Sequence, residues 1–359
     1  MSQRMVGNSP ATVKDIAQHA GVSIGTVDRV LHDRGRVSSE TVQRVWAAVK
    51  KLNYSPNLVA RNLSKAEHKV FGILMPRTDQ DSGYWSLTSA GIDSALGELA
   101  HHYVHVRYFH YDRFSRASFR LAADKLLSEK PDGILLAPAL SEETKKFIRR
   151  TGNIPCVVFD GEVPDTDVLS TISQDSYESG LLAGKLMHLL VPEGHLMTVT
   201  IGSADYHLRR RREGFVRYFD GRKEVHLSHL DLDHGLAGPE LGDALRGTDV
   251  GAQGVFVTNA LGHLVAHQLN GAGGIHTPVI GYDLISENAS CLRAGMMDFV
   301  INQEPRRQGY SSLYVLYRHI VLREQVERRI RMPIDIVMRE NLDFHFTDTH
   351  SNGALRRSE

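Results

Sequence analysis

The chain has 359 residues, with 42 Lys or Arg and 42 Asp or Glu, so its formal net charge is zero, and 42% of its residues are apolar. This length allows two or three folding units with sizeable cores in an ordinary soluble protein. The N-terminus lacks an apolar leader, no apolar run is long enough to span a bilayer, and two cysteines cannot form a disulfide framework, so we expect a cytoplasmic protein with no membrane partner.

The zero net charge conceals a basic N-terminal segment. Residues 1–64 contain nine Lys or Arg and four Asp or Glu, a net charge of +5, and residues 65–359 carry −5. A basic segment attached to an acidic body is the pattern expected of a module that binds nucleic-acid phosphates.

The basic segment begins with two predicted helices. Thr12 can cap the first, and Asp15, three residues later, can complement its free N–H groups. Gly21 interrupts the helical pattern, and Ser23 can cap a second short helix. Helical spacing gives each helix one apolar face, formed by Val13, Ile16, Ala17 and Ala20 in the first and by Val27, Val30 and Leu31 in the second. Two helices joined by a tight glycine-containing turn predict a helix-turn-helix, whose second helix enters the major groove of DNA.

A third predicted helix starts after Ser38 and has Val42, Val45, Val49 and Leu52 at helical spacing. Pro56 then marks a turn, because proline restricts the residue before it and can begin a helix. Leu58 to Leu63 can form a short helix that is unstable alone in water. The alternative to a DNA-binding module is a small helical subdomain that contacts no DNA, and the positive charge favours DNA.

From Val70 onward, short apolar runs alternate with amphipathic segments. The runs are Phe71–Met75, Gly133–Ala137, Cys156–Phe159, Leu196–Thr200, Gly254–Val257 and Pro278–Gly281. The segments between them include Ser86–Leu99, Phe119–Leu127, Ser179–Leu190 and Leu261–Leu269. This alternation predicts parallel sheets with crossover helices, and its length favours two lobes with a cleft over one small sheet.

Polar and aromatic side chains follow several of the predicted strands. In chain order they are Asp79, Tyr84, Trp85, Asp160, Asn259, Asp283 and Gln303. Ligands bind beyond the carboxyl ends of parallel strands, and aromatic faces beside carboxylate and amide groups suit the C–H and hydroxyl groups of a sugar or polyol. We therefore predict a small-molecule site here. As alternatives, Trp85 can pack the start of its helix, and Asp160 and Asp283 can be caps or turn residues.

Two histidine-rich stretches are candidate metal sites. One contains His101, His102, His105 and His110, and the other contains His226, His229, Asp231, Asp233 and His234. Neither is expected on one helix at a fixed repeat, and with 19 histidines in the chain, clustering by chance is expected. No nucleophile elbow, phosphate loop or dinucleotide motif follows a predicted strand. We therefore predict no catalytic residue, no metal and no cofactor.

Several motifs occur in order between residues 12 and 63. They are Thr12-Val13-Lys14-Asp15-Ile16-Ala17, Gly21-Val22-Ser23, Thr26-Val27-Asp28-Arg29-Val30-Leu31, Val37-Ser38, Leu52-Asn53-Tyr54-Ser55-Pro56-Asn57 and Ala60-Arg61-Asn62-Leu63. Together they closely resemble the headpiece and hinge of LacI/GalR-type transcription regulators, and the residues after Leu63 resemble the effector-binding core of that family. The resemblance covers nearly the whole chain.

The resemblance implies a fold and its boundaries. We expect an all-α helix-turn-helix headpiece at 10–56, a hinge helix and linker at 57–67, a core at 68–347 and a loose tail at 348–359. The core would be α/β, two-lobed and periplasmic-binding-protein-like, with two doubly wound parallel sheets. Its N-lobe is expected at about 68–171 and 303–332, and its C-lobe at about 172–300 and 335–347, with three crossings between them.

The resemblance also implies which residues contact DNA. Ile24, Gly25 and Arg29 fall at base-reading positions and Thr26 at a phosphate, and Leu63 would wedge between base pairs in the minor groove. The full implied set is Thr12, Ser23, Ile24, Gly25, Thr26, Asp28, Arg29, Asn57, Ala60 and Leu63. Asp28 replaces a serine common in the family, so we expect an operator that differs from the familiar ones. For Leu63 the alternative is an ordinary linker residue.

In the core, the family-like pattern Arg-x-x-Gly-Phe selects Arg211 as an effector ligand, with a solvated helix face as the alternative. In the family, an aspartate usually follows the asparagine that corresponds to Asn259, whereas this chain has Ala260 at that position. The implied partners are double-stranded operator DNA, a sugar, polyol or sugar acid as effector, and a second copy of the chain in a homodimer or higher oligomer. We therefore expect a cytoplasmic, nucleoid-associated, bacterial-type repressor that binds a pseudo-palindromic operator. A sugar-binding receptor or a sugar-modifying enzyme without DNA regulation is the alternative.

Overall fold

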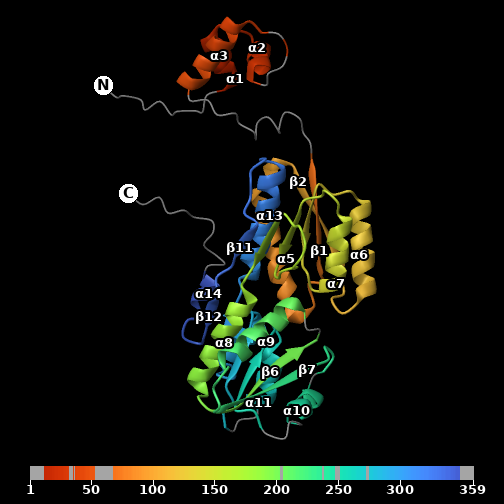
Figure 1. Cartoon of the computed structure of the whole chain (residues 1–359), viewed down its shortest axis with the longest axis vertical. Helices are drawn as coiled ribbons and strands as arrows, with labels where there is room; N and C mark the ends of the chain where they lie inside the picture. The colour runs from red at the N-terminus through yellow and green to blue at the C-terminus, as the bar shows by residue number, and fades with distance from the viewer. Residues whose placement is uncertain are drawn as a thin grey trace, which may run out of the picture. The chain divides into compact units, whose positions relative to one another are not determined.

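The computed structural model describes residues 12–31, 35, 37–52, 68–202, 205–236, 238–246, 251–271 and 275–347. It divides the chain into two compact units, residues 1–65 and 66–359, which we call the headpiece and the core (Figure 1). Asn57, Ala60 and Leu63, expected at the DNA, lie outside the described residues, as does the expected tail at 348–359.

The described headpiece contains the helices α1 (Val13–Ala20), α2 (Ile24–Leu31) and α3 (Ser39–Lys51). The Asp15 carboxylate accepts the Thr12 backbone N–H (2.7 Å), and Thr12 Oγ1 accepts the Asp15 N–H (3.3 Å), which confirms the capping box. Gly21 ends α1 with a φ of 65°, a left-handed conformation that glycine adopts without strain. The headpiece core is formed by Ile16, Ala17, Ala20, Val27, Val30, Val45 and Ala48. These contacts hold α1 and α2 in the predicted helix-turn-helix.

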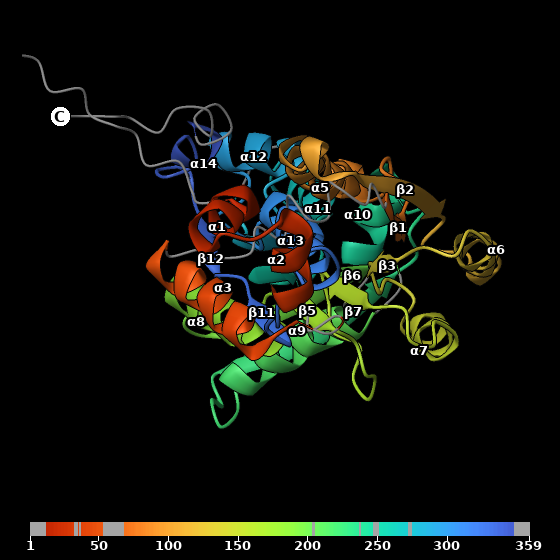
Figure 2. The same ribbon diagram turned by 90° about the horizontal axis from the view of Figure 1, so that it is seen from above.

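The N-lobe of the core is built on a parallel sheet with the strand order β11-β5-β4-β3-β1-β2. Its strands are β1 (Lys69–Pro76), β2 (Val104–Tyr111), β3 (Gly133–Leu136), β4 (Cys156–Phe159), β5 (Ser170–Ser173) and β11 (Arg329–Arg331). Its helices are η1 (Asp81–Gly83), α5 (Tyr84–Glu98), η2 (Ala100–His102), α6 (Arg116–Ser128), α7 (Ser141–Arg150) and α13 (Pro305–Ile320). Helices α6 and α7 lie on one side of the sheet, and α5 and α13 lie on the other (Figures 1 and 2).

The C-lobe is built on a second sheet with the order β12-β10-β9-β8-β6-β7, parallel except for the pair β10 and β12. Its strands are β6 (Gly194–Ile201), β7 (Val225–Leu232), β8 (Gly254–Val257), β9 (Val279–Tyr282), β10 (Phe299–Asn302) and β12 (Asp335–Val337). The helices of the C-lobe are α8 (Ser176–Leu190), α9 (Tyr206–Tyr218), α10 (Gly238–Arg246), α11 (Gly262–Asn270), α12 (Ser286–Arg293) and α14 (Phe344–Thr347).

Each lobe receives a helix that follows a strand of the other lobe. After β5 the chain enters α8, which packs on α9, and after β10 it enters α13, which packs on α5. Figure 1 shows α13, coloured blue, beside the orange α5. A Cβ on Gly180 of α8 would lie 2.0 Å from the Arg211 carbonyl oxygen of α9, and a Cβ on Gly91 of α5 would lie 1.9 Å from the Arg306 carbonyl oxygen of α13. Only glycine permits both helix pairs to approach this closely.

The expected two-sheet α/β core is confirmed. Each of the predicted apolar runs is a buried strand, namely β1, β3, β4, β6, β8 and β9. The edge strands β2 and β7 differ, because they mix exposed with buried side chains and so lack a continuous apolar run. None of the helices in the described ranges combines the length and apolar character needed to cross a bilayer.

Candidate functional site

The exposed surface of the headpiece includes the N-terminal half of α2. Ser23, Ile24 and Gly25 are exposed, and Ile24 keeps 54% of its surface accessible although it is apolar. A Cβ on Gly25 would meet only Ser23 Oγ, at 3.9 Å. The backbone of α2 is therefore open to close approach at Gly25, the second residue of the helix.

Two predicted DNA contacts of the headpiece also have local structural roles. Ser23 Oγ accepts the Thr26 N–H (3.1 Å) and so caps α2. Arg29 Nε donates to the Gly25 carbonyl oxygen (3.1 Å), one turn earlier. This bond engages Nε only. It does not use the two terminal nitrogens of the guanidinium, which can donate together to a guanine edge.

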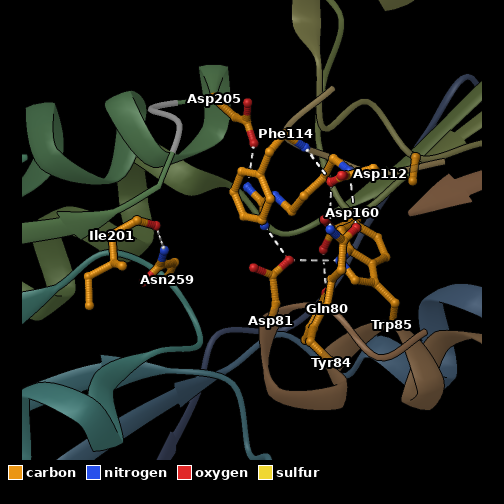
Figure 3. A network of polar contacts seen from close by, with 12 residues as sticks. Gln80, Asp81, Tyr84, Trp85, Asp112, Phe114, Asp160, Ile201, Asp205 and Asn259 are labelled. Carbon is orange, nitrogen blue, oxygen red and sulfur yellow. Dashed lines mark hydrogen bonds and ion pairs between the residues drawn. The ribbon is translucent and has the colours of Figure 1, made fainter. Parts of the chain in front are cut away.

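The core contains a second candidate site, between the lobes, where the strand ends of the N-lobe carry a network of polar contacts. Asp160 directly follows β4 and accepts a hydrogen bond from the Tyr84 hydroxyl. Asp81 accepts from Trp85 Nε1 (2.8 Å). Gln80 donates to Asp112 (2.7 Å). Figure 3 shows these side chains converging from the segments that follow β1, β2 and β4.

Arg113, which follows β2, connects the two lobes. Its Nη1 donates to Asp81 of the N-lobe and its Nη2 donates to Asp205 of the C-lobe (2.8 Å). All three side chains are at most 6% exposed. Next to this ion triad, the Phe114 ring stacks on the His234 ring of the C-lobe with centroids 3.9 Å apart and an interplanar angle of 11°. A buried ion triad and an aromatic pair therefore hold the lobes together at this point.

Arg211 is the central cation on the C-lobe side. The side chain is buried, and its guanidinium carbon lies 3.7 Å from the centre of the Tyr282 ring. Nη1 donates to the Thr258 carbonyl oxygen (2.8 Å) and Nη2 donates to Gln303 Oε1 (3.0 Å). Beside it, Asn259 Nδ2 donates to the Ile201 carbonyl oxygen (2.6 Å). The alternative of a solvated face therefore does not hold for Arg211.

Gln308 of α13 links the two lobes a second time. Its Oε1 accepts the backbone N–H of Asp160 (2.8 Å), and its Nε2 donates to the Gln303 carbonyl oxygen (2.9 Å). Gln303 in turn accepts from Arg211 and hydrogen-bonds to Asp283. Asp160 and Asp283, at the ends of β4 and β9, are thus connected by hydrogen bonds that run from the Asp160 backbone N–H through Gln308 and Gln303 to the Asp283 carboxylate.

Asp160 and Asp283 occupy equivalent places in the two lobes. Each directly follows a central strand, each has a left-handed φ (70° and 67°), and each donates its backbone N–H to the next strand, at Ile172 (3.1 Å) and Ile301 (2.9 Å). Aspartate tolerates this conformation better than most residues. The turn thereby places one carboxylate from each lobe in the site.

Burial raises the pKa of both carboxyl groups. The pKa of Asp283 rises to about 7, mainly through desolvation, against the opposing effect of Arg211. The pKa of Asp160 is raised as well, again mainly by desolvation, although the Tyr84 hydroxyl and Arg211 oppose the rise. Desolvation lowers the pKa of His207 well below its usual value, and Arg211, Arg113 and Arg209 lower it further, so this imidazole is neutral.

Several buried polar atoms at this site have no hydrogen-bond partner among the described residues. They are Arg113 Nε, Arg211 Nε, Asn259 Oδ1, His263 Nδ1 and Asp283 Oδ1. Buried polar atoms are normally paired, and this set offers both donors and acceptors. The site can therefore hydrogen-bond a small molecule that itself carries donors and acceptors, such as hydroxyl groups.

Not all of the predicted effector-binding residues lie in the polar site between the lobes. Tyr84, Asp160, Arg211, Asn259, Asp283 and Gln303 are buried members of the polar site. Asp79 is not among them, because its side chain is 76% exposed and pairs with Arg77 at 3.4 Å. Trp85 packs into the N-lobe core and reaches the network only through Nε1.

Four buried members of the site were absent from the prediction. Asp81, Arg113, Asp205 and Gln308 make the contacts that tie the lobes together. The first three follow the carboxyl ends of strands β1, β2 and β6, so the rule that selected Asp160 and Asp283 could have included them. Gln308 lies within helix α13, so this rule does not select it.

The histidine-rich stretches do not assemble a metal site. In the part of the chain that the structure describes, no group of three or more His, Cys, Asp or Glu side chains is arranged to hold a metal. Individual histidines make other contacts. His102 hydrogen-bonds to the Tyr317 hydroxyl (2.8 Å), His105 to His68 (2.8 Å) and His229 to Thr198 (2.8 Å).

The close packing of α8 on α9 yields a first prediction. Gly180→Ala places a methyl group against the Arg211 carbonyl oxygen, so the helices must separate and Arg211 must shift. We expect a loss of about 1–3 kcal/mol in the free energy of unfolding of the core, measured by urea denaturation. Gly97→Ala in α5 is the matched control, because a Cβ there meets no atom within 4 Å. It should stabilise the helix by about 0.5–1 kcal/mol, and equal effects of both substitutions would contradict the prediction.

Comparison with known proteins agrees with this architecture. Residues 12–57 match the family profile of bacterial regulatory proteins of the lacI family, and residues 71–324 match the profile of the periplasmic binding protein domain. The chain is 28% identical over 348 residues to the HTH-type transcriptional repressor PurR of Mannheimia succiniciproducens, covering 92% of this chain and 98% of that protein. The PurR repressor of Yersinia enterocolitica is 26% identical over 354 residues.

Solved structures show the same fold. A protein from Bacteroides fragilis assigned as a LacI transcriptional regulator superposes with a TM-score of 0.72 at 25% identity, covering 77% of this chain and 99% of that chain. A solute-binding protein from Bacillus halodurans, solved with bound myo-inositol, superposes with a TM-score of 0.69 at 15% identity, covering 79% and 98%. At that identity the second likeness concerns the fold alone.

Proposed function

Because this chain belongs to the LacI family of bacterial regulatory proteins and is a DNA-binding regulator of that type, we propose that it represses transcription as a homodimer bound to a pseudo-palindromic operator. A small polyhydroxylated effector bound between the lobes of the core controls this binding. The observation that carries the effector site is the set of buried, unpartnered donors and acceptors contributed by both lobes.

The headpiece supplies operator contacts. The exposed start of α2 offers Ile24, the open backbone at Gly25 and the Arg29 guanidinium to base edges. The hinge expected at 57–67, with Asn57, Ala60 and Leu63, would enter the minor groove. One headpiece per half-site and twofold symmetry of the dimer require an operator with matching half-sites.

The core converts effector binding into a change at the DNA. Arg113 and Phe114 contact the C-lobe directly, and Gln308 does so through Gln303, in each case beside the unpartnered atoms. An effector that binds one arrangement of the lobes more tightly than the other shifts the equilibrium between them, and its differential affinity for DNA-bound and free protein is the coupling energy.

Selection of bound duplexes from a random DNA pool tests the regulator. The full chain should enrich a sequence with twofold-related half-sites, and its affinity for that sequence should change when sugars or polyols that raise the thermal midpoint are added. If the pool shows no enrichment over random DNA at moderate salt, with or without these compounds, the proposal fails.

Arg29→Ala provides a sharper prediction for the headpiece. Loss of a bidentate contact to guanine should cost about 1–3 kcal/mol of discrimination at one position of each half-site. Binding measured by fluorescence anisotropy on the selected duplex and on its single-base variants gives this value. Lys50→Ala in α3 is the charge-matched control and should weaken binding uniformly across the variants, if at all. If Arg29→Ala also acts uniformly, its contact is to phosphate.

A further inference from the structure

The site between the lobes contains more buried carboxylates than buried cations. Asp81, Asp160, Asp205 and Asp283 contribute four carboxyl groups, whereas Arg113 and Arg211 contribute two guanidinium groups. The imidazole of His207 adds no charge. With every carboxyl group ionised, the protein's own groups leave this buried region with a net negative charge.

These groups act on one another electrostatically. Asp160 and Asp81 both raise the pKa of Asp283, and Arg211 lowers it. Arg211 and Arg113 both lower the pKa of Asp160, and Asp81 raises it. The carboxylates therefore share one low-dielectric region, where an uncompensated charge is costly.

The uncompensated negative charge of the site is concentrated at Asp283. Asp81 and Asp205 accept from Arg113, and Asp160 accepts from Tyr84. The Asp283 carboxylate hydrogen-bonds to Gln303, but its Oδ1 has no partner, and among the described residues it is the one buried carboxylate oxygen without one. The residue is 3% exposed. It lies beyond the end of β9, in the group that includes the unpartnered Arg211 Nε and Asn259 Oδ1. An incoming group would have to donate to it.

We propose that the effector is a cationic polyol, a small hydroxylated molecule whose protonated amine binds the Asp283 carboxylate between the lobes. The proposal rests on the proposed effector site and specifies its ligand class. The amine would supply the missing positive charge, and the hydroxyl groups would use the remaining unpartnered donors and acceptors. In the absence of such a ligand, protonation of Asp283 relieves the same excess.

An anionic sugar fits this site poorly. A carboxylate or phosphate would add a negative charge beside Asp160 and Asp283. The terminal nitrogens of both arginines are already engaged, with Asp81 and Asp205 for Arg113 and with Thr258 and Gln303 for Arg211. An anion would therefore have to bind arginines whose positive charge the carboxylates of the site already offset. The sugar acid that the sequence left open is thus disfavoured.

Matched sets of probes test the charge of the ligand. Each set contains a neutral polyol, its amine and its acid or phosphate: glucose, glucosamine and glucuronate; galactose, galactosamine and galacturonate; myo-inositol, an aminoinositol and myo-inositol 1-phosphate. Calorimetric titration of the full chain at pH 8 should show the amine binding at least tenfold more tightly than its neutral parent in one set, with no measurable binding of the acid. Asp283→Asn should remove that advantage, and Asp220→Asn, which changes an exposed carboxylate, should retain it.

If no probe in any set binds, the thermal midpoint of the unliganded chain tests the proposal instead. If the negative charge is in excess, Asp283→Asn raises the thermal midpoint of the unliganded chain at pH 8, because it removes an uncompensated buried charge and asparagine tolerates the left-handed φ. A lower midpoint overturns the proposal. It is also overturned if an acid or phosphate binds best, or if an amine and its neutral parent bind equally. If a sugar acid changes the operator affinity, the chain is still an effector-controlled regulator, and only the proposal that its effector is cationic is refuted.

Discussion

Arg113→Ala is expected to lower the free energy of unfolding of the core by about 3–5 kcal/mol, because it leaves two buried carboxylates without their shared cation. Asp81 and Asp205 belong to different lobes, so their mutual repulsion should also drive the lobes apart. Urea denaturation measures the first effect. Small-angle scattering of the unliganded chain measures the second as an increase in the radius of gyration.

The matched control is Arg217→Ala. Arg217 on α9 pairs with Asp220 at 2.6 Å, but both side chains are more than half exposed, so solvent screens the pair and its loss should change the free energy of unfolding far less. Arg113→Lys keeps the charge but cannot reach both carboxylates with a planar fork, and should fall between the two. If Arg113→Ala matches Arg217→Ala and the radius of gyration is unchanged, the ion triad does not hold the lobes together.

The second large effect is a loss of stability as pH rises, due to Asp283. Its pKa is about 7 in the folded chain and 3.8 in the unfolded chain, so the folded state binds an extra proton between these values. The contribution of this group to stability is present at low pH and is lost as pH rises towards 7. Between pH 5 and pH 8 it should fall by about 3 kcal/mol.

The difference between the native chain and Asp283→Asn isolates this contribution, because other titrating groups are common to both. Glu143, for example, has its pKa lowered to about 2 by the hydrogen bond from Arg120, and its stabilisation is lost only in acid. Urea denaturation at pH 5 and pH 8 should show that the substitution becomes progressively more favourable as pH rises. A difference that is independent of pH would mean that Asp283 is ionised throughout.

Both effects bear on regulation through the same contacts. Arg113 holds the lobes together at one side of the site, and Asp283 belongs to the hydrogen-bonded chain that runs through Gln303 and Gln308 to Asp160. A ligand that donates to Asp283 therefore acts on a group already connected to both lobes. This is the physical route by which the proposed effector would change the arrangement of the core.

Local patterns in the sequence were enough to predict the secondary-structure elements and the fold class. The capping residues Thr12 and Ser38 and the turn at Gly21 specify the headpiece helices, because capping and left-handed turns depend on residues a few positions apart. The continuous apolar runs specify the buried parallel strands, because a strand covered on both faces needs no polar positions. The position of Asp160 and Asp283 at strand ends then follows from topology.

Which side chains of those segments lie in the site depends on how the two lobes pack. Asp79 and Asp81 are two residues apart after β1, yet the first points to solvent and the second is buried against Arg113. Arg113 and Asp205 are 92 residues apart and belong to different lobes, so no local pattern could pair them. The charge of the site is a sum over such distant pairings in a low-dielectric interior, and it exists only once the two lobes have packed together.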